Sequence, residues 1–372
     1  MKKIIFIIVA AIFIFAFPFS AAAEEERQSI YDISGVEETK GYLSDDARDL
    51  IDGENIDVSD YNWINSIETE SVFSHIWSFI KSGAKAPLRA GFCALAIIIV
   101  AAAARAFGKD GKTDAAVRFA VTLAVCSAVI YGVWGSINTA VNMLKGCSSF
   151  MLAFVPVYMG IVSVSGAPAT AVSNGAMMLA SAEFINAASA FFITSVMGAY
   201  LAVALSSSVS PLVNGAGLAE TFKRVGTWAM SLCTTVFLGL LGAKSAVNSA
   251  ADTLSAKTAK FILGTCVPVA GNTLSGAVNT VASSLSLLKS SVGIYGVIAV
   301  AAMILPVVAE LLLWRLVLNL LSGVCSLFSI DETSKLFKAV DGMLGFLTGA
   351  VILAAAMFII ALAATVGAGK LL

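Results

Sequence analysis

Residues 291–313 read SVGIYGVIAVAAMILPVVAELLL and contain one charged side chain, Glu310. A run of about 20 apolar residues is long enough to cross the hydrocarbon core of a bilayer as a helix. Similar runs recur from about residue 87 onward, and the chain is 58% hydrophobic with a mean hydropathy of +0.90. A soluble domain of 372 residues needs more polar surface than this. The sequence therefore predicts an all-α polytopic membrane protein.

The apolar windows predict six to seven transmembrane helices. Basic residues stay on the cytoplasmic side of a membrane, and Arg105, Lys109, Lys112 and Arg118 surround the turn after the first window. We therefore expect that turn to be cytoplasmic. The six clearest windows are 88–107, 117–135, 184–206, 226–243, 291–313 and 341–366.

The first apolar run has the features of a secretory signal peptide. Lys2 and Lys3 precede a run that is shorter than a span, and a small-residue site ends at Ala23. We expect cleavage after Ala23, which places the mature N-terminus outside the cytoplasm. The alternative is an uncleaved anchor helix.

Residues 24–86 form an acidic segment that we expect to be extracytoplasmic. Residues 24–80 hold fifteen of the 24 acidic residues of the chain. So few apolar positions cannot build an independent core, so we expect short helices that pack on the membrane part or on a partner. Apolar residues from Ile67 to Ile80 recur at helical spacing and predict a juxtamembrane amphipathic helix.

The membrane domain, residues 87–372, contains two apolar stretches that are interrupted by Pro and Gly, 150–181 and 261–288. Each starts at Phe and reaches Val-Pro-Val and then Gly, so Pro156 and Gly160 correspond to Pro268 and Gly271. These matches predict a diverged internal repeat, about 117–225 and 226–340, followed by a final span at 341–366.

Paired breaks in repeated halves mark the functional centre of many transport proteins. Pro156, Gly160, Pro268 and Gly271 are therefore candidates for such a centre. Plain kinks in a packed bundle are the alternative, because Pro and Gly are common in membrane helices. Two re-entrant hairpins make the copies parallel, whereas two complete crossings make them inverted; the positions of the basic residues favour the parallel arrangement.

Groups that could perform catalysis are scarce in this chain. His75 is the only histidine, and the six cysteines lack a C-x-x-C spacing, which predicts free thiols packed as small hydrophobic side chains. The chain has no Walker loop and no dinucleotide fingerprint. We therefore expect no enzymatic activity, no cofactor and no metal.

Two carboxylates fall in or beside predicted spans, Glu183 near Asn186 and Glu310 near Arg315 and Asn319. Charge inside a bilayer is costly and marks functional positions. A proton- or ion-coupling role is one interpretation. The other is that both groups lie close to the membrane interface.

Four stretches together resemble the stage III sporulation protein AE family. They are residues 260–281 (KFILGTCVPVAGNTLSGAVNTV), 288–296 (LKSSVGIYG), 364–369 (ATVGAG) and 31–37 (YDISGVE). Cys266 and Ala270 stand where the family pattern has bulkier residues.

The resemblance implies a non-enzymatic membrane subunit of a trans-envelope channel between mother cell and forespore. It implies other stage III sporulation A proteins and a forespore-side partner, the mother-cell membrane as location, and no nucleic acid. An autonomous secondary transporter is the alternative, and a membrane-embedded enzyme is a weaker one.

Overall fold

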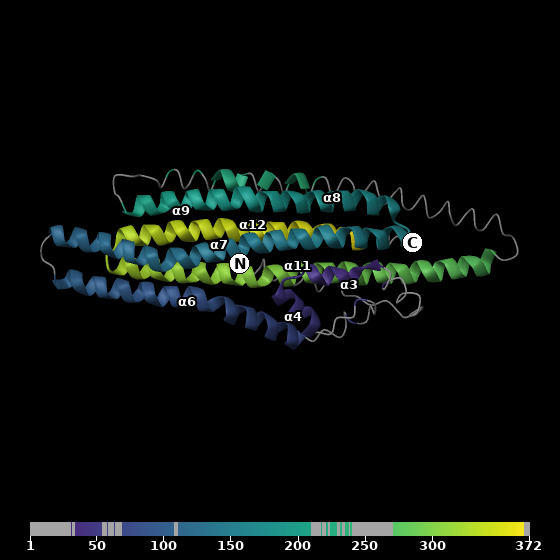
Figure 1. Cartoon of the computed structure of the whole chain (residues 1–372), viewed down its shortest axis with the longest axis horizontal. Helices are drawn as coiled ribbons and strands as arrows, with labels where there is room; N and C mark the ends of the chain where they lie inside the picture. The colour runs from purple at the N-terminus through teal and green to yellow at the C-terminus, as the bar shows by residue number, and fades with distance from the viewer. Residues whose placement is uncertain are drawn as a thin grey trace.

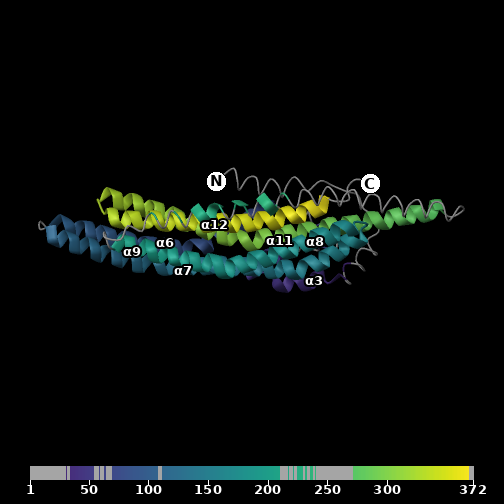
Figure 2. The same cartoon turned by 90° about the horizontal axis from the view of Figure 1, so that it is seen from above.

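The described part of this chain is a bundle of long helices that run along one axis (Figure 1). A computed structural model describes residues 31, 34–53, 58, 63, 69–107, 111–209, 217, 221, 224–228, 231–232, 235–237, 239 and 271–367. The view at right angles shows the same elongated arrangement (Figure 2). The predicted signal peptide, Pro268 and half of the predicted span 226–243 lie outside the described residues.

Helix α6, Thr69–Phe107, joins two elements that the sequence predicted separately. The juxtamembrane amphipathic helix and the first span, 88–107, are one continuous helix through Pro87. Lys81 lies over the Trp77 ring, with its Nζ 5.6 Å from the ring centroid. The polar N-terminal part of α6 therefore leads directly into its apolar part.

Helix α7, Gly111–Val164, has 54 residues and extends far beyond the predicted span 117–135. The predicted break at Pro156 and Gly160 is wrong, because both residues lie inside this helix. The chain reverses at residues 165–167 instead, where Gly166 has a φ of 90°. That left-handed conformation suits Gly, which has no Cβ, and Pro168 at the first turn of α8 suits a helix start.

Segment 150–181 is therefore a helical hairpin made from the end of α7 and from α8, Pro168–Ala187. A π-helical turn, Ala188–Ile193, joins α8 to α9, Thr194–Val209. The Thr194 hydroxyl donates to the Ser189 carbonyl at 3.2 Å across this turn. The predicted span 184–206 is therefore helical but contains a π-turn.

Helices α11, Gly271–Leu327, and α12, Asp331–Gly367, form the second long hairpin. Ser329 adopts a φ of 54° in the turn between them. Asp331 and Glu332 occupy the first turn of α12, where acidic side chains interact favourably with the helix dipole. The α11–α12 turn lies at the same end of the bundle as the end of α6 and the start of α7 (Figure 1).

Four helices of the described part are long and apolar enough to cross a membrane. They are Ser74–Ala104, Phe119–Val164, Leu285–Leu327 and Asp331–Val366, and the apolar helix Thr194–Ser207 is shorter. The predicted all-helical class is confirmed, and the described residues contain four candidate spans where the whole sequence predicted six to seven. The proposed repeat stays a prediction, because residues 241–270 are not described.

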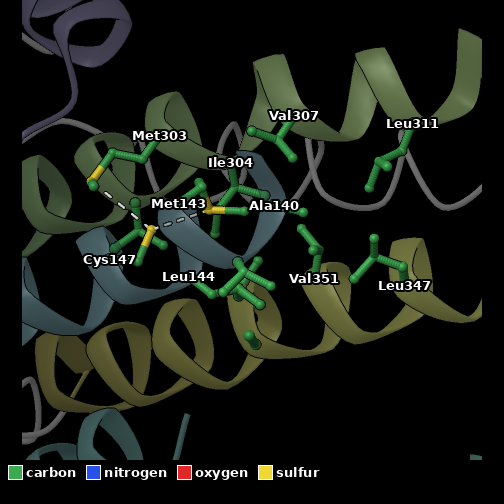
Figure 3. Packing of buried hydrophobic residues seen from close by; sticks show 14 of the residues in the cluster. Ala140, Met143, Leu144, Cys147, Met303, Ile304, Val307, Leu311, Leu347 and Val351 are labelled. Atoms are coloured by element: carbon green, nitrogen blue, oxygen red, sulfur yellow. Dashed lines mark hydrogen bonds between the residues drawn. The ribbon is translucent and has the colours of Figure 1, made fainter. Parts of the chain in front are cut away.

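The core lies where α7, α11 and α12 meet. Ala140 and Leu144 of α7 pack beside Ile304 of α11 and Val351 of α12 (Figure 3). The Cys147 thiol lies in the same layer, with its Sγ 3.6 Å from the Sδ of Met143 and 3.9 Å from that of Met303. The sequence prediction of a thiol packed as a small hydrophobic side chain is confirmed at Cys147.

The acidic segment contains short helices, as the sequence predicted. They are α3, Val36–Thr39, the 3₁₀ turn η1, Lys40–Tyr42, and α4, Asp45–Gly53. Helices α3 and η1 contact α7, whereas α4 contacts α11. Apolar side chains such as Val36, Ala47 and Ile51 are buried in these contacts.

Candidate functional site: the polar contacts of the bundle

Glu310 lies at a junction of three helices. It is half-buried on α11 and accepts a hydrogen bond from the hydroxyl of Ser136 on α7. Helix α6 approaches the same point through Gly83, where an added Cβ would lie 3.4 Å from the Cβ of Glu310. The carboxylate therefore has a defined partner and a closely packed neighbour.

Arg315 pairs with Asp341 of α12. The Arg315 Nε donates to Asp341 Oδ1 at 2.9 Å, and the two side chains are 30% and 19% exposed. Asn319 donates its amide to the Arg315 carbonyl at 2.8 Å. Glu310 and Arg315, which are close in sequence, therefore have different side-chain partners.

Hydroxyl and amide side chains connect the helices elsewhere in the core. Thr122 of α7 and Thr333 of α12 lie 3.0 Å apart, and so do the hydroxyls of Ser322 and Ser334 on either side of the α11–α12 turn. At the opposite end, Asn174 of α8 donates to Thr365 of α12 at 3.2 Å. Because a buried polar group without a partner is costly, such pairs fix the relative positions of the helices.

The other candidate residues lie apart from Glu310. Pro156 and Gly160 are exposed on α7, Glu183 is exposed on α8, and Gly271 is the first residue of α11. Pro268 lies outside the described residues. The structure therefore places the candidates on different helices and does not gather them at one site.

Sequence reasoning missed Ser136 and Asp341 as the partners of Glu310 and Arg315. Asp341 is the first residue of the predicted span 341–366, and a lone acid at that boundary was the available indication. Nothing in the sequence around Ser136 distinguishes it from other small residues of α7. Both partners are distant in sequence and depend on how the helices pack.

Ser291 of α11 makes two hydrogen bonds to the acidic segment. The Ser291 hydroxyl donates to the Val58 carbonyl at 2.7 Å and accepts from Trp63 Nε1 at 2.9 Å. In α4, partial burial raises the pKa of the Asp46 carboxyl, and the neighbouring Asp49 and Asp45 raise it further. This contact joins a strongly acidic segment to a helix that is apolar along most of its length.

Metal ligands do not gather in the described part of the chain. No group of three His, Cys, Asp or Glu side chains in these residues could hold a metal ion. Cys126, Cys147 and Cys325 are buried free thiols, and Cys93 is an exposed one. The polar contacts described above are pairs between helices, and their geometry suits helix association.

Long apolar helices joined by buried polar pairs define a multi-pass helical membrane protein. Residues 61–369 match the family model described as stage III sporulation protein AE, and the chain belongs to that family.

A curated relative gives the same result. The chain is 30% identical over 165 residues to the stage III sporulation protein AE of Bacillus subtilis (strain 168). The match covers 44% of this chain and 41% of the relative, so it spans about two-fifths of that protein's length. No solved structure matches this chain.

Proposed function

We propose that this chain is a non-enzymatic membrane subunit of a channel or secretion complex that joins the mother cell to the forespore. Membership of the stage III sporulation protein AE family over residues 61–369 is the observation that carries the proposal. The partners are other stage III sporulation A proteins and a protein on the forespore side.

In this proposal the chain lies in the mother-cell membrane that surrounds the forespore. Residues 1–23 are a cleaved signal peptide, and the acidic segment that follows lies between the two membranes. Its fifteen acidic residues suit water and not hydrocarbon. Its contacts with α7 and α11 keep it against the bundle.

The α7–α8 hairpin is the part of the chain that we propose as the functional centre, together with its counterpart around Pro268 and Gly271. Pro156 and Gly160 support this because both are exposed on α7, four residues apart. Residues four apart lie on one face of a helix. That face is available to a neighbouring subunit.

Co-purification tests the subunit proposal. A tagged chain is isolated from sporulating cells after crosslinking, and a tagged vegetative membrane protein serves as the control. We expect other stage III sporulation A proteins to be enriched with this chain alone. Recovery of the tagged chain without them would contradict the proposal.

The secondary transporter is the alternative function. It gives Glu310 and Glu183 coupling roles, and the half-buried position of Glu310 beside Ser136 is the observation that favours it. It predicts solute flux by the purified chain in liposomes, abolished by Glu310→Gln. The continuous helix through Pro156 weighs against it, because a broken helix at that position was its main support.

A further inference from the structure

The long helices of this bundle exceed the thickness of a bilayer. At 1.5 Å per residue, the 54 residues of α7 and the 57 of α11 measure about 81 and 86 Å. The hydrocarbon core is about 30 Å thick. More than half of each helix therefore lies outside the hydrocarbon, and the exposed side chains indicate which half.

The exposed face of α7 changes character near Trp134. Before this point Leu123 and Tyr131 are exposed, and Tyr131 is 86% exposed. After it the exposed residues include Asn138, Asn142 and Ser149. Apolar side chains face lipid, whereas Tyr and Trp favour the membrane interface.

The exposed side chains of α6 change from polar to apolar along the chain, which is the opposite order to α7. This order is expected for an antiparallel neighbour. Lys81, Lys85 and Arg89 are exposed before the change, and Phe92, Ile99 and Val100 are exposed after it. Trp77 and Leu88 are the large apolar side chains exposed on the polar part.

Two close contacts place these changes at one level of the bundle. A Cβ on Gly91 of α6 would lie 2.6 Å from Val317, and a Cβ on Gly132 of α7 would lie 2.6 Å from Trp314. Val317 and Trp314 are one turn apart on α11. On α6 and α7 the change from polar to apolar exposure therefore lies at one level, beside Trp314 and Val317 of α11.

Helix α11 follows the same boundary. Leu316, Leu320 and Leu327 are exposed beyond it, together with the polar Asn319, whereas residues 291–310 include no exposed side chain. Packing inside the bundle thus accounts for the apolar character of 291–310. Val164, Val172, Phe184 and Ile360 are exposed on the other half as scattered positions, which is normal for a protein surface.

The acidic segment also indicates which half of the bundle lies outside the hydrocarbon. It contacts α11 at Ser291, on the far side of the boundary from Leu316. A segment with this many carboxylates cannot be placed in hydrocarbon. The level of Ser291 must therefore lie in water.

We infer that lipid surrounds only the half of the bundle that carries the exposed apolar residues, here named the lipid belt. The other half, here named the outer half, stands in water on the side of the acidic segment. From Phe119 to Trp134 the belt measures about 24 Å at 1.5 Å per residue, which is most of the hydrocarbon core. The belt consists of Phe92, Ile99, Val100, Phe119, Leu123, Tyr131, Trp134, Leu316, Leu320 and Leu327.

Helix α12 carries exposed charged side chains at the level of the belt. Its Thr333 lies 3.0 Å from Thr122 of α7, which places Lys335 and Lys338 beside the belt part of α7. Long lysine side chains reach from such positions to the interface. Glu310 and Ser136 then lie just outside the belt, where a half-buried carboxylate is tolerated.

Spin-label accessibility tests this inference on the full chain in lipid nanodiscs. Single cysteines replace Leu123 and Leu320 in the belt, Asn142 and Ser149 in the outer half, and Asp49 in the acidic segment as the water reference. The six natural cysteines are replaced first, and each variant must remain monodisperse. Four of these positions lie on the bundle and the fifth, Asp49, is the reference. All five are exposed, so a label fits without repacking.

We expect accessibility to oxygen to exceed that to a water-soluble nickel chelate several-fold at Leu123 and Leu320. Asn142 and Ser149 should match Asp49, with the chelate favoured. If Asn142 or Ser149 behaves as Leu123 does, or if either leucine behaves as Asp49 does, the inference is wrong. The measurement needs no partner protein, so its outcome is independent of the proposed function.

Discussion

The guanidinium of Arg315 and the carboxylate of Asp341 join α11 to α12 at 2.9 Å. Both side chains are partly exposed, so the pair is weaker than a fully buried one. We expect Asp341→Asn to lower the free energy of unfolding in detergent by about 1–2 kcal/mol, because Arg315 loses its charged partner. Arg315→Leu alone and the double variant complete a mutant cycle. A coupling energy of zero would show that the pair contributes nothing to the joining of α11 and α12.

Gly132 and Gly135 differ in the space that a methyl group would find. A Cβ at Gly132 would lie 2.6 Å from two ring atoms of the buried Trp314, whereas nothing lies within 4 Å of a Cβ at Gly135. Gly132→Ala should destabilise the bundle by about 1–3 kcal/mol through overpacking. Gly135→Ala should be neutral or stabilising by up to about 1 kcal/mol, because Ala favours helix more than Gly. Thermal unfolding of the two variants compares them, and equal midpoints would refute the close contact.

Ser291 should hold the acidic segment in place, whereas Ser290 should not. Ser291→Ala removes the hydrogen bonds to Val58 and Trp63, but Ser290 donates only within its own helix, to the Ser286 carbonyl at 2.9 Å. The loss of buried partners costs about 1–3 kcal/mol, so limited proteolysis within residues 31–63 should accelerate about tenfold in Ser291→Ala. Ser290→Ala is the matched control. Identical cleavage rates would mean that the serine does not fix the segment.

Gly160 tests the proposed contact of the α7–α8 hairpin with a neighbouring subunit. Nothing lies within 4 Å of a Cβ at this position, so Gly160→Phe should fold normally but obstruct a partner that packs on α7. We expect it to lose co-purification with stage III sporulation A proteins and to reduce spore yield at least tenfold. Gly135→Phe, also at an open position of α7, is the control. Normal assembly of Gly160→Phe would remove this face from the proposed centre.

Reporter fusions test the direction of α7. Because α7 is one helix from Gly111 to Val164, fusions after Lys112 and after Ser165 should report opposite sides of the membrane. A fusion after Phe328 should agree with Lys112, since the α11–α12 turn lies at the same end of the bundle. We expect cytoplasmic activity at Lys112 and Phe328 and exterior activity at Ser165. The same compartment at Lys112 and Ser165 would mean that α7 does not cross.

Apolar run length predicted the helical class because hydropathy is a property of each segment alone. It could not place the helix ends. The helix that contains the predicted span 117–135 extends to Val164, because the polar residues after Trp134 continue the same helix. Pro156 was misread for a related reason. A proline removes one backbone donor, and a long helix that is packed on both sides of that point tolerates the loss.

Tertiary partners were the least predictable feature. Arg315 was grouped with Glu310 because they are five residues apart, yet its partner Asp341 comes from the next helix. Five residues place two side chains on different faces of a helix, whereas i and i+4 share one. Helical spacing therefore argued against the Glu310 and Arg315 pair before any partner was known.

The uninterrupted α7 also has a mechanical consequence. Helix α7 continues from Gly111 to Val164 with one backbone donor missing, at Pro156, and with no loop at which its two ends could move separately. We therefore expect a tilt imposed on the α7–α8 hairpin by another protein to reach the opposite end of α7, beside the turn that follows α6. Helix α7 then transmits movement along the length of the bundle.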